Sequence, residues 1–233
     1  MVKKEILILS LVLLLPLEVA AAMPVDWLLY QEREPGVDPY PVRILVSERF
    51  MRIDDGYEGS DFVLFDRRAR TIFSITREEK SMLVIHDSVF DRQSGAPDIE
   101  VRVTQPKGAP KIAGRQVKEF EMHAGGDLCL SASVVPGLLP DVSQALAEYQ
   151  QVLAARQFRD LDKTPPELRT PCFLANYVYG NERHLQHGLP IREAVTGGRM
   201  RVLMDYRAGA AMDEALFELP KGYRRLELGG GAD

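Results

Sequence analysis

The chain has 233 residues, of which 45% are hydrophobic and 27% are charged, and its formal net charge is −5 at pH 7. This composition is typical of a globular protein with one sizeable core, and it lacks the signature of a disordered chain. Because phosphate neutralisation needs clustered Lys and Arg, a mildly acidic chain without a basic block argues against nucleic acid as the main partner.

The N-terminus has the pattern of a secretory signal peptide. Lys3 and Lys4 give a positive start, an almost unbroken apolar run covers residues 6–15, and Ala20-Ala21-Ala22 is a small-residue cleavage site. The apolar run is about half of the ~20 residues that a membrane-spanning helix needs, so removal is favoured over anchoring. We therefore expect a signal peptide over residues 1–22, cleavage near Ala22, and a periplasmic mature chain without a transmembrane segment.

The cysteines agree with export. The chain contains two, Cys129 and Cys172, and the periplasm keeps disulfides oxidised. A bond between them would stabilise the fold by about 4 kcal/mol on the chain-entropy estimate. The alternative is two separate buried thiols.

The first half of the mature chain shows short strands separated by tight turns. Strands are expected at Trp27 to Gln31, Val42 to Val46, Phe50 to Ile53, Phe62 to Phe65, Ile72 to Ile75 and Met82 to Ile85. The breaks between the later strands are too short for parallel crossovers, so this part should be an antiparallel meander.

Two of these strands have apolar residues on both faces. Phe62-Val63-Leu64-Phe65 and Met82-Leu83-Val84-Ile85 do not alternate with polar residues, as strands with one wet face would. Both sides must therefore be covered, unless one side forms an apolar cleft.

The second half contains further strands and the best helix. Strands are expected at Ile99 to Val103, Gln116 to Met122, Leu128 to Val134 and Met200 to Met204. Leu138 to Gln157 has the period of an amphipathic helix, with Asp141 as its expected N-cap. Cys172 to Tyr179 is ambiguous between helix and strand. No composition shift marks a boundary, so residues 23–233 are expected to form a single domain.

Three local patterns resemble an uncharacterised bacterial periplasmic family that is similar to the outer-membrane lipoprotein carrier and insertion factors. They are the meander around Met51-Arg52-Ile53-Asp54, the stretch Lys111-Ile112-Ala113-Gly114 leading into residues 117–121, and the closing strand and turn at residues 216–223. The resemblance implies a mostly β α+β fold, in which a curved antiparallel half-barrel wraps around helices. In the carriers, the apolar concave face of this sheet holds acyl chains.

Several clusters of reactive residue types suggest chemistry, and each has a simpler explanation. His184 and His187 have a spacing that would put two imidazoles on one side of a helix as the start of a zinc or copper site, but two surface histidines in a polar loop are expected instead. His86-Asp87-Ser88 holds the residue types of a hydrolase triad, yet contiguous strand residues point to alternate faces. No phosphate-binding glycine loop or dinucleotide fingerprint is present, so we expect no cofactor.

Two charged turns are also candidates for binding. An acidic loop could hold calcium weakly, although a solvated hairpin loop is favoured; its members are Asp54, Asp55, Glu58 and Asp61. Arg67, Arg68 and Arg70 could meet lipid headgroups or an acidic partner, or they could simply deter pairing at a strand tip.

The remaining candidate is a set of apolar residues that would line a lipid site. Its members are Val46, Phe62, Leu64, Phe73, Val84, Phe120 and Met122, and the alternative for each is plain core. These residues suggest an exported, non-catalytic protein that binds an acyl chain, a lipid or a lipidated protein. The second hypothesis is an envelope interaction module with a filled core, whose partner is another envelope protein.

Overall fold

The computed structural model describes residues 22–91 and 95–227. The predicted signal peptide therefore lies outside the described residues, except for Ala22, which is the first residue of the first strand.

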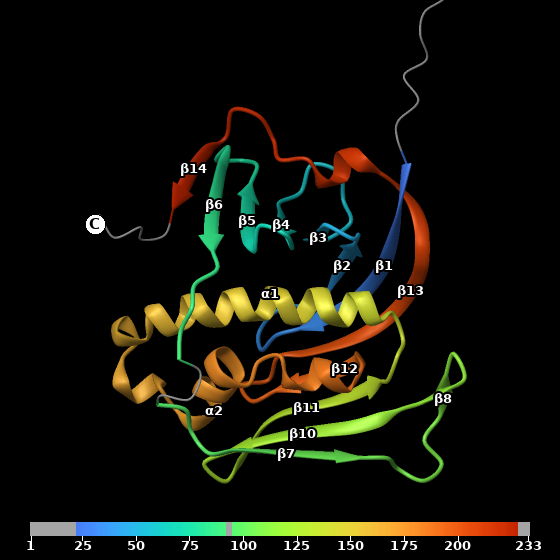
Figure 1. Cartoon of the computed structure of the whole chain (residues 1–233), viewed down its shortest axis with the longest axis vertical. Helices are drawn as coiled ribbons and strands as arrows, with labels where there is room; N and C mark the ends of the chain where they lie inside the picture. Colours follow the sequence, from blue (N-terminus) through green and yellow to red (C-terminus); the bar gives the residue numbers. More distant parts are fainter. Residues whose placement is uncertain (1–21, 92–94, 228–233) are drawn as a thin grey trace, which may run out of the picture.

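One large curved sheet of twelve strands forms the framework (Figure 1), in the order β14-β6-β5-β4-β3-β2-β1-β13-β12-β11-β10-β7. Neighbours are antiparallel except β14 and β6, which are parallel. The sheet is open, with β14 at one edge and β7 at the other, so the predicted mostly β half-barrel is confirmed. The strands are β1 Ala22–Arg33, β2 Tyr40–Val46, β3 Phe50–Asp54, β4 Phe62–Asp66, β5 Thr71–Thr76, β6 Ser81–His86, β7 Ile99–Thr104, β10 Lys118–Ala124, β11 Asp127–Val135, β12 Leu189–Val195, β13 Met200–Asp213 and β14 Arg224–Glu227. A separate small hairpin joins β8 Lys111–Ile112 and β9 Arg115–Gln116.

The sheet curves around the long helix α1, which crosses the concave side between strands β2–β6 and strands β7 and β10–β12 (Figure 1). Short helical segments follow it in the chain and pack beside it. The helical elements are α1 Pro140–Arg159, η1 Leu161–Lys163, η2 Pro166–Leu168, α2 Pro171–Leu174, η3 Ala175–Tyr179, η4 Arg183–His187 and η5 Glu214–Phe217. None of the described helices is long and apolar enough to cross a membrane.

The meander from β2 to β6 forms as predicted, and its turns show why. Asp66 Oδ1 accepts hydrogen bonds from the backbone N–H groups of Arg68 and Ala69, which holds the β4–β5 turn in shape. Arg70 completes that turn with φ of 52°. An Asx turn of this kind favours a tight antiparallel reversal between two strands that are rich in β-branched and aromatic residues.

The pairing of β1 with β13 joins the two halves of the sheet. These strands are much longer than predicted, with 12 and 14 residues. Two irregularities interrupt their register, next to Asp26 and between Leu29 and Tyr30, and such bulges increase local twist. The ribbon therefore supplies the bend that lets the sheet wrap around α1.

The helix α1 begins differently from the prediction. Asp141 is not the N-cap; it lies in the first turn, and the cap is Leu139 in the left-handed region at φ 42°. Pro140 is the first helical residue, where its missing N–H costs nothing because that position has no intrahelical partner. The predicted helix itself is confirmed.

The ambiguous and closing segments are now assigned. Cys172 to Tyr179 is helical, divided between α2 and the π-helical turn η3. Residues 216–223, expected as a closing strand and turn, form the end of η5, an extended crossing and a turn at Lys221 and Gly222. The predicted turn is therefore present, whereas the last strand is β14 beyond it. The predicted disulfide between Cys129 and Cys172 is present and ties α2 to β11.

Candidate functional site

The seven residues predicted to line a lipid site lie in three separate clusters. Val46 belongs to the core between α1 and the concave face. Phe62, Leu64, Phe73 and Val84 belong to a cluster on the opposite, convex face of the meander. Phe120 and Met122 lie in the other half of the sheet beside the disulfide. The structure therefore brings four of the seven together and separates the other three from them.

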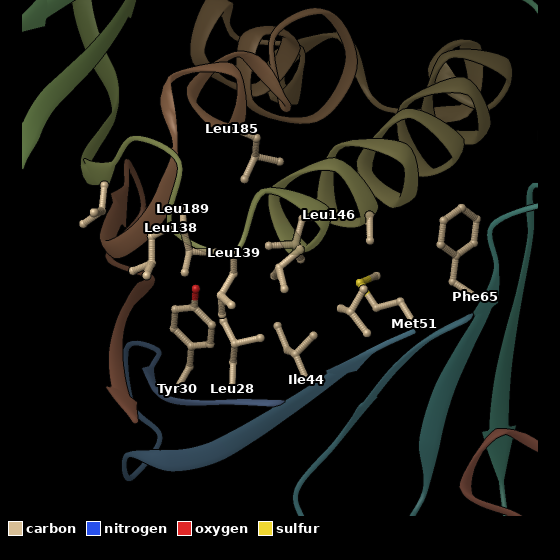
Figure 2. Close-up of a cluster of buried hydrophobic side chains, with 14 of the residues drawn as sticks. Leu28, Tyr30, Ile44, Met51, Phe65, Leu138, Leu139, Leu146, Leu185 and Leu189 are labelled. Carbon is tan, nitrogen blue, oxygen red and sulfur yellow. The ribbon is translucent and has the colours of Figure 1, made fainter. Parts of the chain in front are cut away.

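The concave face of the meander is filled by side chains. Figure 2 shows Leu28, Ile44 and Met51 pointing from the strands toward Leu139 and Leu146 of the helical layer. All five are at most 9% exposed. The protein's own helix therefore fills the concave side of the meander.

The convex face of the meander is covered by the C-terminal part of the chain. We call residues 214–223 the strap; it follows β13 and crosses toward β14 at the far edge of the sheet (Figure 1). The ring of Phe217 stacks on Phe50 with centroids 6.1 Å apart. Arg52 Nη1 donates a hydrogen bond of 2.7 Å to the carbonyl oxygen of Leu216. These contacts fix the start of the strap on β3.

A buried ionic group supports this attachment. Asp54 accepts from Arg43 Nε at 2.7 Å and from Arg52 Nε at 2.5 Å, and its side chain is 1% exposed. Burial alone would raise the pKa of Asp54, but the two guanidinium groups outweigh it and hold the pKa below its ordinary value. The Arg52 guanidinium also lies 3.8 Å from the ring centroid of Phe62. A charged strand position thus serves as the anchor of the strap.

An open groove of about 440 Å³ remains between the strap and the convex face. Its apolar lining comes from strands β3–β5 and from the strap: Phe50, Leu64, Phe73, Phe217 and Leu219. Charged residues line its rim: Arg49, Asp66, Glu218 and Lys221. Leu64 and Phe73 were predicted to line a lipid site, and both do line this groove.

The rim carries charges of both signs. Arg49 Nη2 lies 2.8 Å from Asp66 Oδ2. Burial works to raise the pKa of Asp66, yet the hydrogen bonds from Arg49 and from two backbone N–H groups lower it overall. Glu218 and Lys221 add one charge of each sign from the strap. An apolar floor with a balanced polar rim fits a ligand whose main contact is hydrocarbon.

The two histidines of the His-x-x-His motif do not lie in a surface loop. Both are in η4, His184 is 3% exposed, and the rings of both lie beside Phe120. His184 Nε2 lies 2.5 Å from Glu193 Oε1, and Arg201 approaches the other oxygen of Glu193. Burial, assisted by Arg201, lowers the pKa of His184 to about 3, so this ring is neutral at pH 7. Across residues 22–91 and 95–227, no three His, Cys, Asp or Glu side chains form a group suited to a metal ion.

The triad-like residues point to different partners. His86 Nδ1 is 3.2 Å from Thr71 Oγ1, whereas Asp87 accepts a hydrogen bond from Arg70 Nε at 2.8 Å. Ser88 contributes its backbone N–H to Asp87. Nucleophilic catalysis requires the three side chains to converge on one point, and these three do not.

The acidic loop and the three arginines have structural partners. Asp54 is buried in the anchor described above, so the prediction of a solvated loop is wrong for that residue. Asp55 and Asp61 each accept from a different backbone N–H. Arg67 pairs with Glu148 of α1 at 2.7 Å, and Arg70 donates to Gln151 of α1. The β4–β5 turn is thereby attached to the helix.

Sequence reasoning missed three residues of the groove, namely Phe50, Phe217 and Leu219. Phe50 begins a predicted strand and lies two residues before Arg52, so both side chains project from the convex side. This spacing is detectable in the sequence. Phe217 and Leu219 carried no such signal, because they lie outside the sheet and reach the groove only through the path of the strap.

Comparisons with known proteins give fold-level likeness only. No family model matches the chain, and no curated protein matches it. An uncharacterized conserved protein from Thermus thermophilus is similar over 88% of this chain and 91% of its own, with 8% identity and a TM-score of 0.46. PNGF-II matches 89% of this chain with 31% of its own length, at 10% identity and a TM-score of 0.42.

A LolA superfamily protein from Nitrosomonas europaea is also similar, over 86% of this chain and 91% of its own, with 10% identity and a TM-score of 0.34. Each of these three is a weak likeness of fold.

Proposed function

We propose that this chain is an exported, non-catalytic binding protein for a hydrophobic ligand in the bacterial envelope, and that the ligand's hydrocarbon chain lies in the convex groove. The observation that carries the proposal is the open apolar groove under the strap. Its volume of about 440 Å³ falls within the ~300–1,000 Å³ that is usual for small-molecule sites. The predicted signal peptide at residues 1–22 supports the periplasm as its location.

The chemistry of the groove favours an acyl chain or a lipid over a polar metabolite. Apolar burial contributes about 0.8 kcal/mol per methylene group, so a long chain needs no specific polar contact to bind. The lining offers two phenylalanine rings from the sheet and one from the strap, with leucines between them. A rim with both charge signs would tolerate the head of a lipid, or the protein part of a lipidated protein, at the mouth.

A fluorescent fatty-acid probe tests this proposal. The mature protein should bind the probe saturably, and Leu219→Arg should abolish binding because it places a charge in the apolar lining of the groove. Leu168→Arg is the matched control, since Leu168 lies in η2, is 58% exposed and does not line the groove. Both variants should keep the circular dichroism spectrum of the parent.

The result that contradicts the proposal is equally direct. Absence of saturable binding to the parent protein, or equal binding by Leu219→Arg and the parent, would exclude the groove as a lipid site. Native mass spectrometry of protein purified from its own periplasm gives a second measurement, in which co-purifying lipid is the expected outcome.

The second hypothesis is an interaction module that docks another envelope protein and holds no ligand. The filled concave face favours it, because the space that would hold a ligand inside the half-barrel is taken by α1 and its leucines (Figure 2). A lipid-free protein that excludes apolar probes would support this second function.

A further inference from the structure

One edge of the large sheet is open. β7 is the last strand in the order, and in the described part of the chain β10 is its only strand neighbour. Five of its six residues are exposed, including Val101 and Val103 at 38% and 37%. The outer backbone groups of such a strand are available to pair with another strand.

The side chains of β7 divide cleanly between the two faces. Ile99, Val101 and Val103 lie on the same face of the sheet as Phe120 and Met122. In the pairing with β10, Val101 lies opposite Met122 and Val103 lies opposite Phe120. Glu100 and Arg102 lie on the opposite face and are 3.1 Å apart, with side chains 62% and 61% exposed. Hence β7 has one apolar face and one charged face, and the charged face carries one charge of each sign.

We propose that β7 is a homodimer interface, in which a second copy of this chain pairs with it in antiparallel orientation about a two-fold axis beside Val101. Glu100 then lies directly opposite the partner's Arg102, and Arg102 lies opposite the partner's Glu100. On the other face, Val101 meets its own copy and Ile99 meets the partner's Val103. Directly opposite pairs of these kinds stabilise an antiparallel pairing.

The charges select this register over its neighbours. In a continuous sheet, opposite residues must share a face, so the register can slip only in steps of two residues. A slip in one direction puts Arg102 opposite the partner's Arg102, and a slip in the other puts Glu100 opposite the partner's Glu100. Both place like charges directly opposite, which is destabilising. The axis beside Val101 avoids both conflicts.

The adjacent strand places an opposite charge beside Arg102. Across the existing β7–β10 pairing, Glu121 lies opposite Arg102. In the dimer Arg102 would therefore be flanked by Glu121 on its own chain and by the partner's Glu100. The partner copy continues a pattern already present in the sheet.

The interface is small. Pairing two six-residue strands buries less than the ~1,200 Å² of a standard stable interface, so the dimer should be reversible and dependent on concentration. Sedimentation velocity or light scattering over a concentration series measures it. We expect the average mass of the mature protein to rise toward twice the monomer value as concentration increases.

Charge reversal provides the decisive variants. Glu100→Arg or Arg102→Glu alone should raise the dimer dissociation constant by about tenfold or more, because each creates two like-charge pairs in the symmetric interface. The double variant should restore dimerisation. A mixture of the two single variants should form a heterodimer, since each charge then meets its opposite. Asp205→Arg on β13, an exposed reversal away from β7, is the matched control and should leave dimerisation unchanged.

Three outcomes would overturn the interface. The first is a monomer at every concentration, in which case the two charges serve only to protect the edge. The second is a dimer that is insensitive to both reversals. The third is a pair of single variants that do not associate when mixed, although each is folded by circular dichroism.

Discussion

The two faces of the meander are made by the same strands and are covered in opposite ways. On the concave face, a twenty-residue helix packs with its leucines against the sheet and leaves the core filled (Figure 2). On the convex face, the cover is the strap, and a groove of about 440 Å³ stays open beside it. Alternation within β4 supplies apolar side chains to both faces, so the cover decides which face is filled and which keeps an open groove.

The largest expected effect comes from removing the anchor of the strap, which is the ionic group of Asp54 with Arg43 and Arg52. Asp54→Asn should lower the free energy of unfolding by about 3–5 kcal/mol, because it leaves the buried Arg52 and the partly buried Arg43 without their carboxylate. Denaturant unfolding measures the loss. Asp55→Asn is the control, since Asp55 makes only a local contact, and its change should stay within about 0.5 kcal/mol. Equal effects of the two variants would contradict the anchor.

A mutation on the filled concave face should change the stability of the protein and not its binding of a fatty-acid probe. Leu146→Ala, in the helix and 2% exposed, should cost about 2–5 kcal/mol of unfolding free energy as a cavity mutation. Its affinity for a fatty-acid probe should equal that of the parent at a temperature where both are folded. Leu219→Ala should do the reverse, weakening probe binding while costing less stability. Identical behaviour of the two variants would remove the functional distinction between the faces.

As the pH falls, the contribution of His184 to stability should be lost before that of Asp54, which anchors the strap. His184 in η4 has a pKa lowered to about 3, so between its unfolded value of about 6.5 and pH 3 only the unfolded chain gains the proton. Stability is complete above pH 6.5 and falls below it, by about 1.4 kcal/mol per pH unit once the unfolded histidine is protonated.

The carboxylate of Asp54 acts at lower pH. Its lowered pKa gives stability that is present above the unfolded value of about 3.9 and is lost as pH falls further. Unfolding measured at pH 7, 6 and 5 should therefore show a slope that is much smaller in His184→Asn, with a remainder from His187, whose pKa burial also lowers. An unchanged slope in that variant would assign it to other groups.

The smallest expected effect concerns the stacked rings of Phe50 on β3 and Phe217 in the strap. A double-mutant cycle of Phe50→Leu with Phe217→Leu should give a coupling of about 0.5–1.5 kcal/mol, the usual value for a stacked aromatic pair. Thermal and denaturant unfolding of the four proteins provide the measurement. A coupling of zero would mean that the start of the strap is held by Arg52 alone.

The sequence predicts the sheet better than it predicts the site, for a physical reason. Strands such as Phe62–Asp66 show their period and their two apolar faces locally, and the cysteine pair was predicted from the number of cysteines and the expected export. The site depends on where residues 214–223 pass over the sheet, which is a tertiary property without a local period. The apolar pattern predicted Leu64 and Phe73, which line the groove, but it could not separate them from Val46, Phe120 and Met122, which lie in other clusters.

The buried polar residues were harder still to read. Asp54 looks like a loop carboxylate in the sequence, because Asp-Asp-Gly is a turn signal. Its burial depends on Arg43 and Arg52, which neighbouring strands place beside it. His184 is expected from the sequence in a polar surface loop and is instead buried in η4, beside Phe120 of β10 and Glu193 of β12. In both cases the deciding partner comes from another element of the fold.

The ribbon of β1 and β13 has a consequence for how the protein reaches its native state. Its register joins Ala22 to Asp213, so the strands that connect the two halves come from opposite ends of the described chain. Loop closure over such a span is slow, and a topology rich in distant contacts folds late. The sheet therefore cannot be completed until its last strands have left the ribosome.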